Sequence, residues 1–262
     1  MKLFSFVMVL FLSHSTVAVE FSTPLHSAVS EGNLKKVVEL LDLGINVEEP
    51  TKNKRKDTPL QYAVEWGHTD IIETLLKYGA NPNMLNGIGY APIHYATTRE
   101  YPDLKVLKLL MSYGGDANAT ATNGTTLLLS AIQNENVNAI SYLLKKGADP
   151  NTKGPHAPLI CDAVMTENIE IISLMAKHGA NINHARCRLM IFGAKEPEYG
   201  SPMHLEKCNS KLLKKLVSQG ADATIKSSKG RTVTQLAEAV EDGWDNGKDC
   251  SSAIRYLSIV KT

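Results

Sequence analysis

Three histidines could take part in acid-base catalysis, but each occupies the same place in a recurring four-residue pattern. His26 ends the stretch Thr23-Pro24-Leu25-His26, His94 ends Ala91-Pro92-Ile93-His94, and His204 ends Ser201-Pro202-Met203-His204. A catalytic set needs its groups within hydrogen-bond reach, whereas copies in successive repeated units would lie on the order of 10 Å apart. We therefore expect these histidines to be structural.

Other signatures of catalysis are missing from the sequence. It contains no nucleophile elbow, no glycine loop for phosphate, no paired-histidine metal motif, and no cysteine and histidine at a recognised catalytic spacing. The sequence thus predicts a protein that is not an enzyme and that takes no cofactor and no metal.

The four cysteines all lie in the C-terminal half of the chain, at Cys161, Cys187, Cys208 and Cys250. Their spacings of 26, 21 and 42 residues include no close pair of the kind that zinc sites use. An even number of cysteines in an oxidising compartment favours two disulfides, for which three connectivities exist.

One short stretch is strongly basic, although the chain as a whole is nearly neutral. Lys52, Lys54, Arg55 and Lys56 place four positive charges within five residues. This stretch is either a solvated loop or a local patch for an acidic partner. The totals of 28 Lys and Arg and 27 Asp and Glu give no overall field that would favour nucleic acid or an anionic membrane.

The element that recurs along the chain is a pair of short helices, seen most clearly in residues 58–83. Thr58 suits the N-cap and Pro59 the first helical position, while Gly67 ends the first helix. A second helix carries an apolar face over residues 71–76 and closes at Gly79. Helices of two or three turns are too short to be stable alone, so the pair must pack against a neighbour.

The helix openings and the closing turns both repeat. Openings stand near residues 23, 58, 91, 126, 158, 201 and 232, and the turn glycines are Gly44, Gly79, Gly114, Gly147, Gly179 and Gly220. Successive turn glycines are 35, 35, 33, 32 and 41 residues apart. This pattern resembles the ankyrin repeat family. The resemblance implies an all-α solenoid of about seven helix-turn-helix repeats in one domain, residues 19–262.

The first 18 residues resemble a secretory signal peptide. Lys2 precedes an apolar run from Leu3 to Leu12, and Thr16-Val17-Ala18 supplies small residues before a cut. The run is too short to span a bilayer, and the absence of a cysteine after the cut argues against a lipid anchor. We expect export to the periplasm or secretion, with Val19 as the mature N-terminus. The alternative is a capping helix of the solenoid.

The resemblance also assigns roles to the cysteines and histidines. In this family the histidine of the opening hydrogen-bonds between loops, which agrees with a structural role. Positions on the repeat favour the pairs Cys161 with Cys187 and Cys208 with Cys250. Residues 183–200 form an enlarged finger, which is the loop that leads from one repeat to the next. Its apolar run Leu189 to Phe192 either folds back onto the solenoid or projects as a partner-binding loop.

Ankyrin repeats usually bind proteins through a concave face made by finger tips and exposed positions of the first helices. The matching positions in this chain are Asp57, Glu65, Trp66, Tyr90, Thr98, Arg99, Gln133 and Asn134. Trp66, Tyr90 and Arg99 are of types enriched at binding hot spots, although Trp66 could equally serve in packing. By offset, Trp66 and Arg99 should stand side by side.

The leading hypothesis is a monomeric, non-enzymatic protein-binding module in the periplasm, such as an immunity protein that sequesters a toxin acting there. A periplasmic partner in oxidative-stress defence, a role of some bacterial relatives, is the alternative within that class. A secreted effector acting on a host protein is a different class, which glycans at Asn118 or Asn123 would favour. An enzyme is the third class, which a bound metal would revive.

Overall fold

The computed structural model describes residues 23–97, 104–184, 186–189, 198–205, 208–239 and 250–260. In these residues it contains fourteen helices and two short strands. The described residues form two compact units, one of residues 23–96 with 104–122 and one of Thr97 with the residues from 123 onward. The expected signal peptide, residues 1–18, lies outside the described residues.

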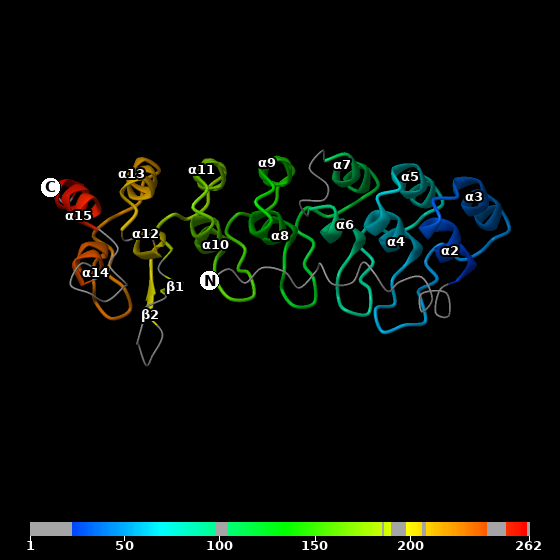
Figure 1. Ribbon diagram of the computed structural model, residues 1–262, viewed down its shortest axis with the longest axis horizontal. Coiled ribbons are helices and arrows are strands. Elements are labelled where there is room, and N and C mark those ends of the chain that lie inside the picture. The colour runs from blue at the N-terminus through cyan, green and yellow to red at the C-terminus, as the bar shows by residue number, and fades with distance from the viewer. Residues whose placement is uncertain are drawn as a thin grey trace. The chain divides into compact units, whose positions relative to one another are not determined.

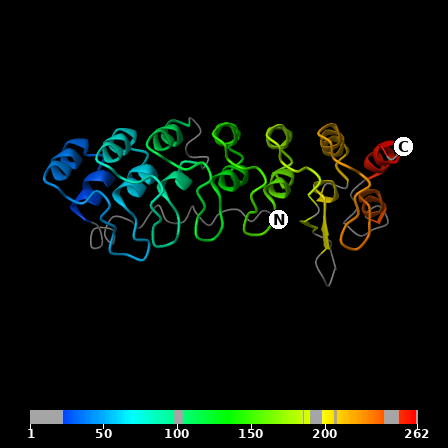
Figure 2. The same ribbon diagram turned by 180° about the vertical axis from the view of Figure 1, so that it is seen from behind.

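The first unit consists of helices that follow one another in pairs. The pairs are α2 (Pro24–Ser30) with α3 (Leu34–Asp42), α4 (Pro59–Trp66) with α5 (Thr69–Lys77), and α6 (Pro92–Tyr95) with α7 (Lys105–Ser112). In Figures 1 and 2 the first helices of this unit form one row and the second helices another, with the fingers extending from the row of first helices.

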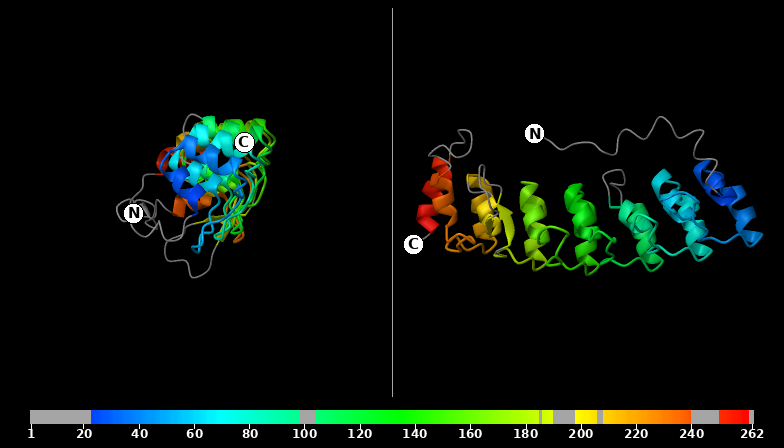
Figure 3. Two further views of the ribbon diagram at one scale, coloured as in Figure 1. Left: turned by 90° about the vertical axis from the view of Figure 1, so that its right-hand side faces the viewer. Right: turned by 90° about the horizontal axis from the view of Figure 1, so that it is seen from below.

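The second unit continues the same pairing and adds two strands. Its elements are α8 (Leu127–Gln133), α9 (Val137–Lys145), α10 (Leu159–Met165), α11 (Ile169–Lys177), β1 (Cys187–Leu189), β2 (Glu198–Gly200), α12 (Pro202–Leu205), α13 (Ser210–Ser218), α14 (Val233–Ala239) and α15 (Ser251–Val260). Seen from below in Figure 3, the helices of this unit lie side by side. First helices pack on first helices, since α8 contacts α10 and α10 contacts α12.

The local sequence explains where the helices begin and end. The Thr58 hydroxyl accepts a hydrogen bond from the Gln61 amide, and the Gln61 side chain accepts one from the Thr58 amide, which together form a capping box. Gly67 closes α4 with a φ of 74°, a left-handed conformation that favours glycine. These boundaries agree with those expected from the pattern of residues 58–83.

The core lies between the two rows of helices in each unit. Leu60 and Ala63 on α4 are fully buried, as are Ile71, Ile72 and Leu75 on α5. Each fully buried Leu or Ile side chain contributes about 1.5 to 3 kcal/mol relative to an exposed one. Because each helix is short, this burial between neighbours supplies the stability that an isolated pair lacks.

An asparagine clamp joins successive turns within each of the two units. The Asn83 amide nitrogen donates to the Gly114 carbonyl at 2.8 Å, and the Asn83 amide oxygen accepts from the Asp116 main chain at 3.0 Å. Asn151 forms the same pair of bonds with Gly179 and Asn181, and Asn183 forms it with Gly220 and Asp222. Each clamp therefore fixes one turn to the next turn along the chain.

Two short strands, β1 and β2, pair antiparallel within residues 183–200, where the sequence analysis expected an enlarged finger. Cys187 lies opposite Gly200 and Leu189 opposite Glu198. Leu189 is buried, whereas residues 190–197, with most of the apolar run Leu189 to Phe192, lie outside the described residues. The expected all-α fold lacked this ladder, because three-residue strands are too short to show a period of two.

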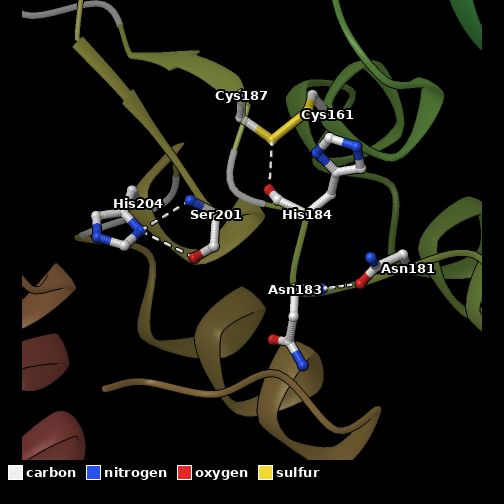
Figure 4. The surroundings of a disulfide bond; sticks show 7 residues. All are labelled: Cys161, Asn181, Asn183, His184, Cys187, Ser201 and His204. Carbon is white, nitrogen blue, oxygen red and sulfur yellow. Dashed lines mark hydrogen bonds between the residues drawn. A yellow bond between two sulfur atoms is a disulfide. The ribbon is translucent and has the colours of Figure 1, made fainter. Parts of the chain in front are cut away.

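Both disulfides are present, in the pairing that the repeat positions favour. Cys161 on α10 bonds to Cys187 on β1 with a Cα–Cα distance of 5.4 Å, and Cys208 bonds to Cys250 with 4.6 Å. Figure 4 shows that the first bond lies beside the main chain of His184. The first disulfide therefore ties the hairpin to α10, and the second ties the turn after α12 to the start of α15.

Candidate protein-binding face

Two of the three repeated histidines, His26 and His204, form hydrogen bonds between loops, as expected, whereas Nδ1 of His94 accepts a bond from the amide of Ala91 in its own opening. His26 Nε2 lies 2.9 Å from the Asp57 carbonyl oxygen, and His204 Nε2 lies 3.1 Å from that of Arg231. The Ser201 amide donates to His204 Nδ1 at 3.1 Å (Figure 4). The ring is therefore a neutral imidazole, held by Ser201 at Nδ1 and by the Arg231 carbonyl at Nε2. Burial lowers the pKa of both His26 and His204. These rings are structural supports of the fingers.

Arg55 connects the finger between α3 and α4 to the end of α4. Its guanidinium donates to both carboxylate oxygens of Glu65, with Nη1–Oε1 at 3.3 Å and Nη2–Oε2 at 3.0 Å. Its Nε lies 2.8 Å from Oδ2 of Asp57. Burial disfavours the charge on Arg55, but the carboxylates of Glu65 and Asp57 outweigh that effect and raise its pKa. The finger is thus fixed against the first helix by a two-bond fork.

Asp57 is a structural residue, which corrects the expectation that it contacts a partner. Its side chain is 1% exposed, and besides Arg55 it accepts a hydrogen bond of 2.6 Å from the Asn86 amide nitrogen. A carboxylate buried in this way cannot reach a partner's surface. Sequence offset placed Asp57 correctly before the helix opening but contained no information on which way the side chain turns.

Glu65 and Trp66 occupy the exposed end of α4. The Trp66 side chain is 50% exposed, and Glu65 is exposed while it is held in the fork with Arg55. A half-exposed tryptophan beside an ordered ion pair has the accessibility that the hot-spot interpretation requires. It also keeps about half of its surface covered by the protein, so the choice between binding and packing for Trp66 stays a prediction.

Tyr90 supports the base of its finger. Its ring meets that of His94 edge-on at a centroid distance of 5.7 Å, and its carbonyl oxygen accepts a bond of 2.8 Å from the Gln61 side chain. Its side chain is half-buried. Thr98 and Arg99 lie outside the described residues, so the expected pairing of Arg99 with Trp66 stays a prediction.

Two other candidate residues lie at the end of α8, in the second unit. Gln133 is exposed, whereas Asn134 is half-buried and its amide nitrogen donates to the Ser130 carbonyl at 2.8 Å. Asn134 therefore satisfies a carbonyl of the last turn of α8. Of the two, Gln133 has the side chain that is accessible to a partner.

Among the described residues, no three His, Cys, Asp or Glu side chains converge where they could hold a metal ion. Of the helices in the described part of the chain, none has the length and apolar character that a membrane crossing requires.

Comparison with protein families identifies the repeats. The family model for ankyrin repeats in three copies matches residues 5–86 and 93–186, which is more than half of the chain. The chain belongs to the ankyrin repeat family. Ankyrin relatives include the human transient receptor potential cation channel subfamily A member 1, 34% identical over 128 residues that make up 48% of this chain and 11% of that protein. A putative ankyrin repeat protein of Rickettsia felis is 32% identical over 49% of this chain and 42% of that protein.

These ankyrin relatives match the chain over less than half of their own length. Solved ankyrin structures match it more fully. The ankyrin repeat domain of Bcl-3, of the IkappaB protein family, has a TM-score of 0.72 and 26% identity, with 90% of this chain and 98% of that chain covered. The human ASB11 ankyrin repeat domain, at 18% identity and a TM-score of 0.66, supports the fold alone.

One feature of the ankyrin fingers was missed by the sequence reasoning. Met84, Leu85 and Ile88 lie in the finger between α5 and α6 and are 38%, 46% and 51% exposed. Three large apolar residues in a turn that contains Asn86 and Gly87 are a signal that could have been noticed. A turn has no helical face on which to bury such side chains, so they remain at the surface.

Proposed function

We propose that this chain is a non-enzymatic protein-binding module that acts after export. Ankyrin solenoids present extended surfaces that bind proteins. The observation that carries the proposal for this chain is Trp66, half-exposed at the end of α4 beside the Arg55–Glu65 fork. An aromatic side chain on a rigid support loses little conformational freedom when it binds, which favours a role as an anchor.

Two features support a location outside the cytoplasm. Residues 1–18 resemble a signal peptide, and two disulfides within the second unit suit an oxidising compartment. A rigid binding surface in the periplasm suits an immunity protein that sequesters a toxin arriving there. This is the specific function that we propose.

A pull-down from the native envelope fraction, with the mature chain as bait, tests the proposal. We expect one partner to be retained, and we expect Trp66→Ala to weaken it by about thirtyfold, equivalent to about 2 kcal/mol. Leu43→Ala is the matched control, because Leu43 is 79% exposed but follows the second helix α3. If the Trp66→Ala and Leu43→Ala variants bind the partner equally well, the binding face does not include Trp66.

The identity of the partner separates the two periplasmic hypotheses. A toxin whose activity is blocked by the mature chain would support the immunity function. An oxidative-stress enzyme in the eluate would support the defence hypothesis instead. Retention of no protein from any envelope fraction would contradict both.

A further inference from the structure

The finger between α3 and α4 presents three lysines that have no ion-pair partner among the described residues. Lys52, Lys54 and Lys56 are all exposed, whereas Arg55 between them is neutralised by Asp57 and Glu65. We call these three residues the lysine finger. Its surplus positive charge is therefore on the side chains that reach solvent.

The loop that carries the lysine finger is held in shape by hydrogen bonds among its own residues. The Thr51 amide donates to the Asp57 carbonyl at 2.8 Å, which closes the loop. The Asn53 carboxamide oxygen accepts from the amides of Arg55 and Lys56 at 2.9 and 3.1 Å. An ordered loop has less conformational entropy to lose when it binds than a flexible one does.

The finger between α5 and α6 carries exposed apolar side chains and contacts the finger between α3 and α4 through the main chain. We call Met84, Leu85 and Ile88 the apolar finger. The Gly87 amide donates to the Arg55 carbonyl at 2.5 Å. Ile88 follows Gly87 in the chain and Lys54 precedes Arg55, so each is next to one of the two bonded residues. A methyl group on Gly87 would collide with the carbonyl oxygens of Lys54 and Arg55, so the two fingers are in direct main-chain contact.

From this juxtaposition we infer that the two fingers bind a protein segment that carries acidic and apolar side chains together. The carboxylates would meet Lys52, Lys54 and Lys56, and the apolar side chains would cover the apolar finger. This deepens the proposed function and rests on it, because it names the chemistry of the partner.

A protein segment fits this surface better than the other anionic partners. Nucleic acid binding is usually built from a basic patch on a strongly basic domain, whereas this chain has a net charge of +1. Attachment to an anionic membrane usually takes a larger cluster of basic residues than three. The exposed apolar side chains have no counterpart in a phosphate backbone.

The test measures fluorescence anisotropy with the full mature chain and three labelled synthetic peptides. In the first peptide glutamate alternates with leucine; in the second, glutamine replaces glutamate; in the third, serine replaces leucine. We expect the first to bind roughly tenfold tighter than either control at about 50 mM salt, with the advantage over the uncharged peptide falling at about 300 mM. Equal affinity for the three peptides would overturn the inference.

Variants locate the binding. Replacing all three residues of the lysine finger by glutamine should weaken the first peptide roughly tenfold. The matched control, Lys35→Gln with Lys211→Gln and Lys226→Gln, removes the same charge from exposed positions elsewhere and should bind as the native chain does. Ile88→Ser should also weaken binding. An equal loss in the control variant would mean that only net charge matters and would overturn the inference.

Two further probes separate this inference from its competitors and from the proposed function. Vesicles of phosphatidylglycerol or single-stranded DNA that bind more tightly than the first peptide would overturn the inference. If the first peptide does not bind but an envelope partner is retained in a manner that depends on Trp66, the inference fails and the proposed function stands.

Discussion

The Gln61 side chain donates a hydrogen bond of 2.8 Å to the Tyr90 carbonyl oxygen, in the place where His26 and His204 bond to a carbonyl in other repeats. Its amide oxygen accepts from the Thr58 amide at 2.6 Å, as a histidine Nδ1 does elsewhere. Glutamine and histidine are therefore interchangeable in geometry at this position, but only histidine titrates.

This equivalence predicts how His204→Gln changes the response to acid. Burial lowers the pKa of His204 in the folded chain, so the unfolded chain takes up the proton first as the pH falls. The contribution to stability is full above the unfolded pKa of about 6.5 and is lost as the pH falls below it. We expect His204→Gln to lose less stability than the native chain between pH 7.5 and pH 5.

Urea unfolding at the two pH values measures this difference. His26→Gln is a second test in the first unit, because burial lowers the pKa of His26 as well, and it should reduce the loss of stability in the same way. The prediction is wrong if His204→Gln and the native chain lose the same stability.

Arg55→Met should destabilise the first unit by about 2 kcal/mol, because it leaves the buried carboxylate of Asp57 without its cation. We expect less than the loss typical of a fully buried pair, since Arg55 is 38% exposed. The double variant with Asp57→Asn should recover part of the loss in a double-mutant cycle. An additive result in chemical unfolding would show that the two charges are not coupled.

Asp162→Asn should stabilise the chain at neutral pH. Burial raises the pKa of Asp162 to about 6, so the folded chain disfavours its ionised form. The penalty is full above that pKa and disappears as the pH falls toward the unfolded value of about 3.9. We expect a gain of about 1 kcal/mol at pH 7.5, less than the whole shift implies because the side chain is partly solvated.

Thermal unfolding at pH 7.5 and pH 4.5 tests the sign for Asp162, and the gain should be smaller at the lower pH. Glu238→Gln on α14 provides the control, since Glu238 is exposed. If the stability gained by Asp162→Asn is larger at pH 4.5 than at pH 7.5, the raised pKa of Asp162 is wrong.

The double variant Cys208→Ser with Cys250→Ser should lose about 4 kcal/mol of unfolding free energy. This is the stabilisation that the loop-closure entropy of the unfolded chain predicts for a loop of 42 residues. The bond spans 42 residues and joins the turn after α12 to α15. Reduction of the native chain should cost at least as much, because it opens Cys161–Cys187 as well. Unchanged unfolding in urea under oxidising conditions would mean that local packing alone holds α15.

The sequence predicts the helices well because their ends depend on local chemistry. Thr58, Pro59 and Gly67 each act within one turn of their own position. The disulfide pairs could also be ranked, since the repeat fixes which edge of the solenoid a residue occupies. The capping residues and turn glycines therefore determine both the helix ends and the spacing of the repeats.

Exposure on the candidate face could not be predicted from spacing. Asp57 is buried because Arg55 and Asn86 reach it from other parts of the fold, and no offset rule contains those contacts. Ile88 is 51% exposed, although Asn86 in the same finger is buried. The exposure of these side chains depends on tertiary contacts between neighbouring fingers, which local sequence does not determine.

The asparagine clamps at Asn83, Asn151 and Asn183 each reach only the next turn, and this has a mechanical consequence. Under tension along the chain, a turn that loses its clamp releases one neighbour and leaves the clamps beyond it intact. Extension should then proceed in steps about one repeat long, as expected for a structure whose cohesion is nearest-neighbour. Such a chain would unfold one repeat at a time under tension and refold one repeat at a time when the tension is released.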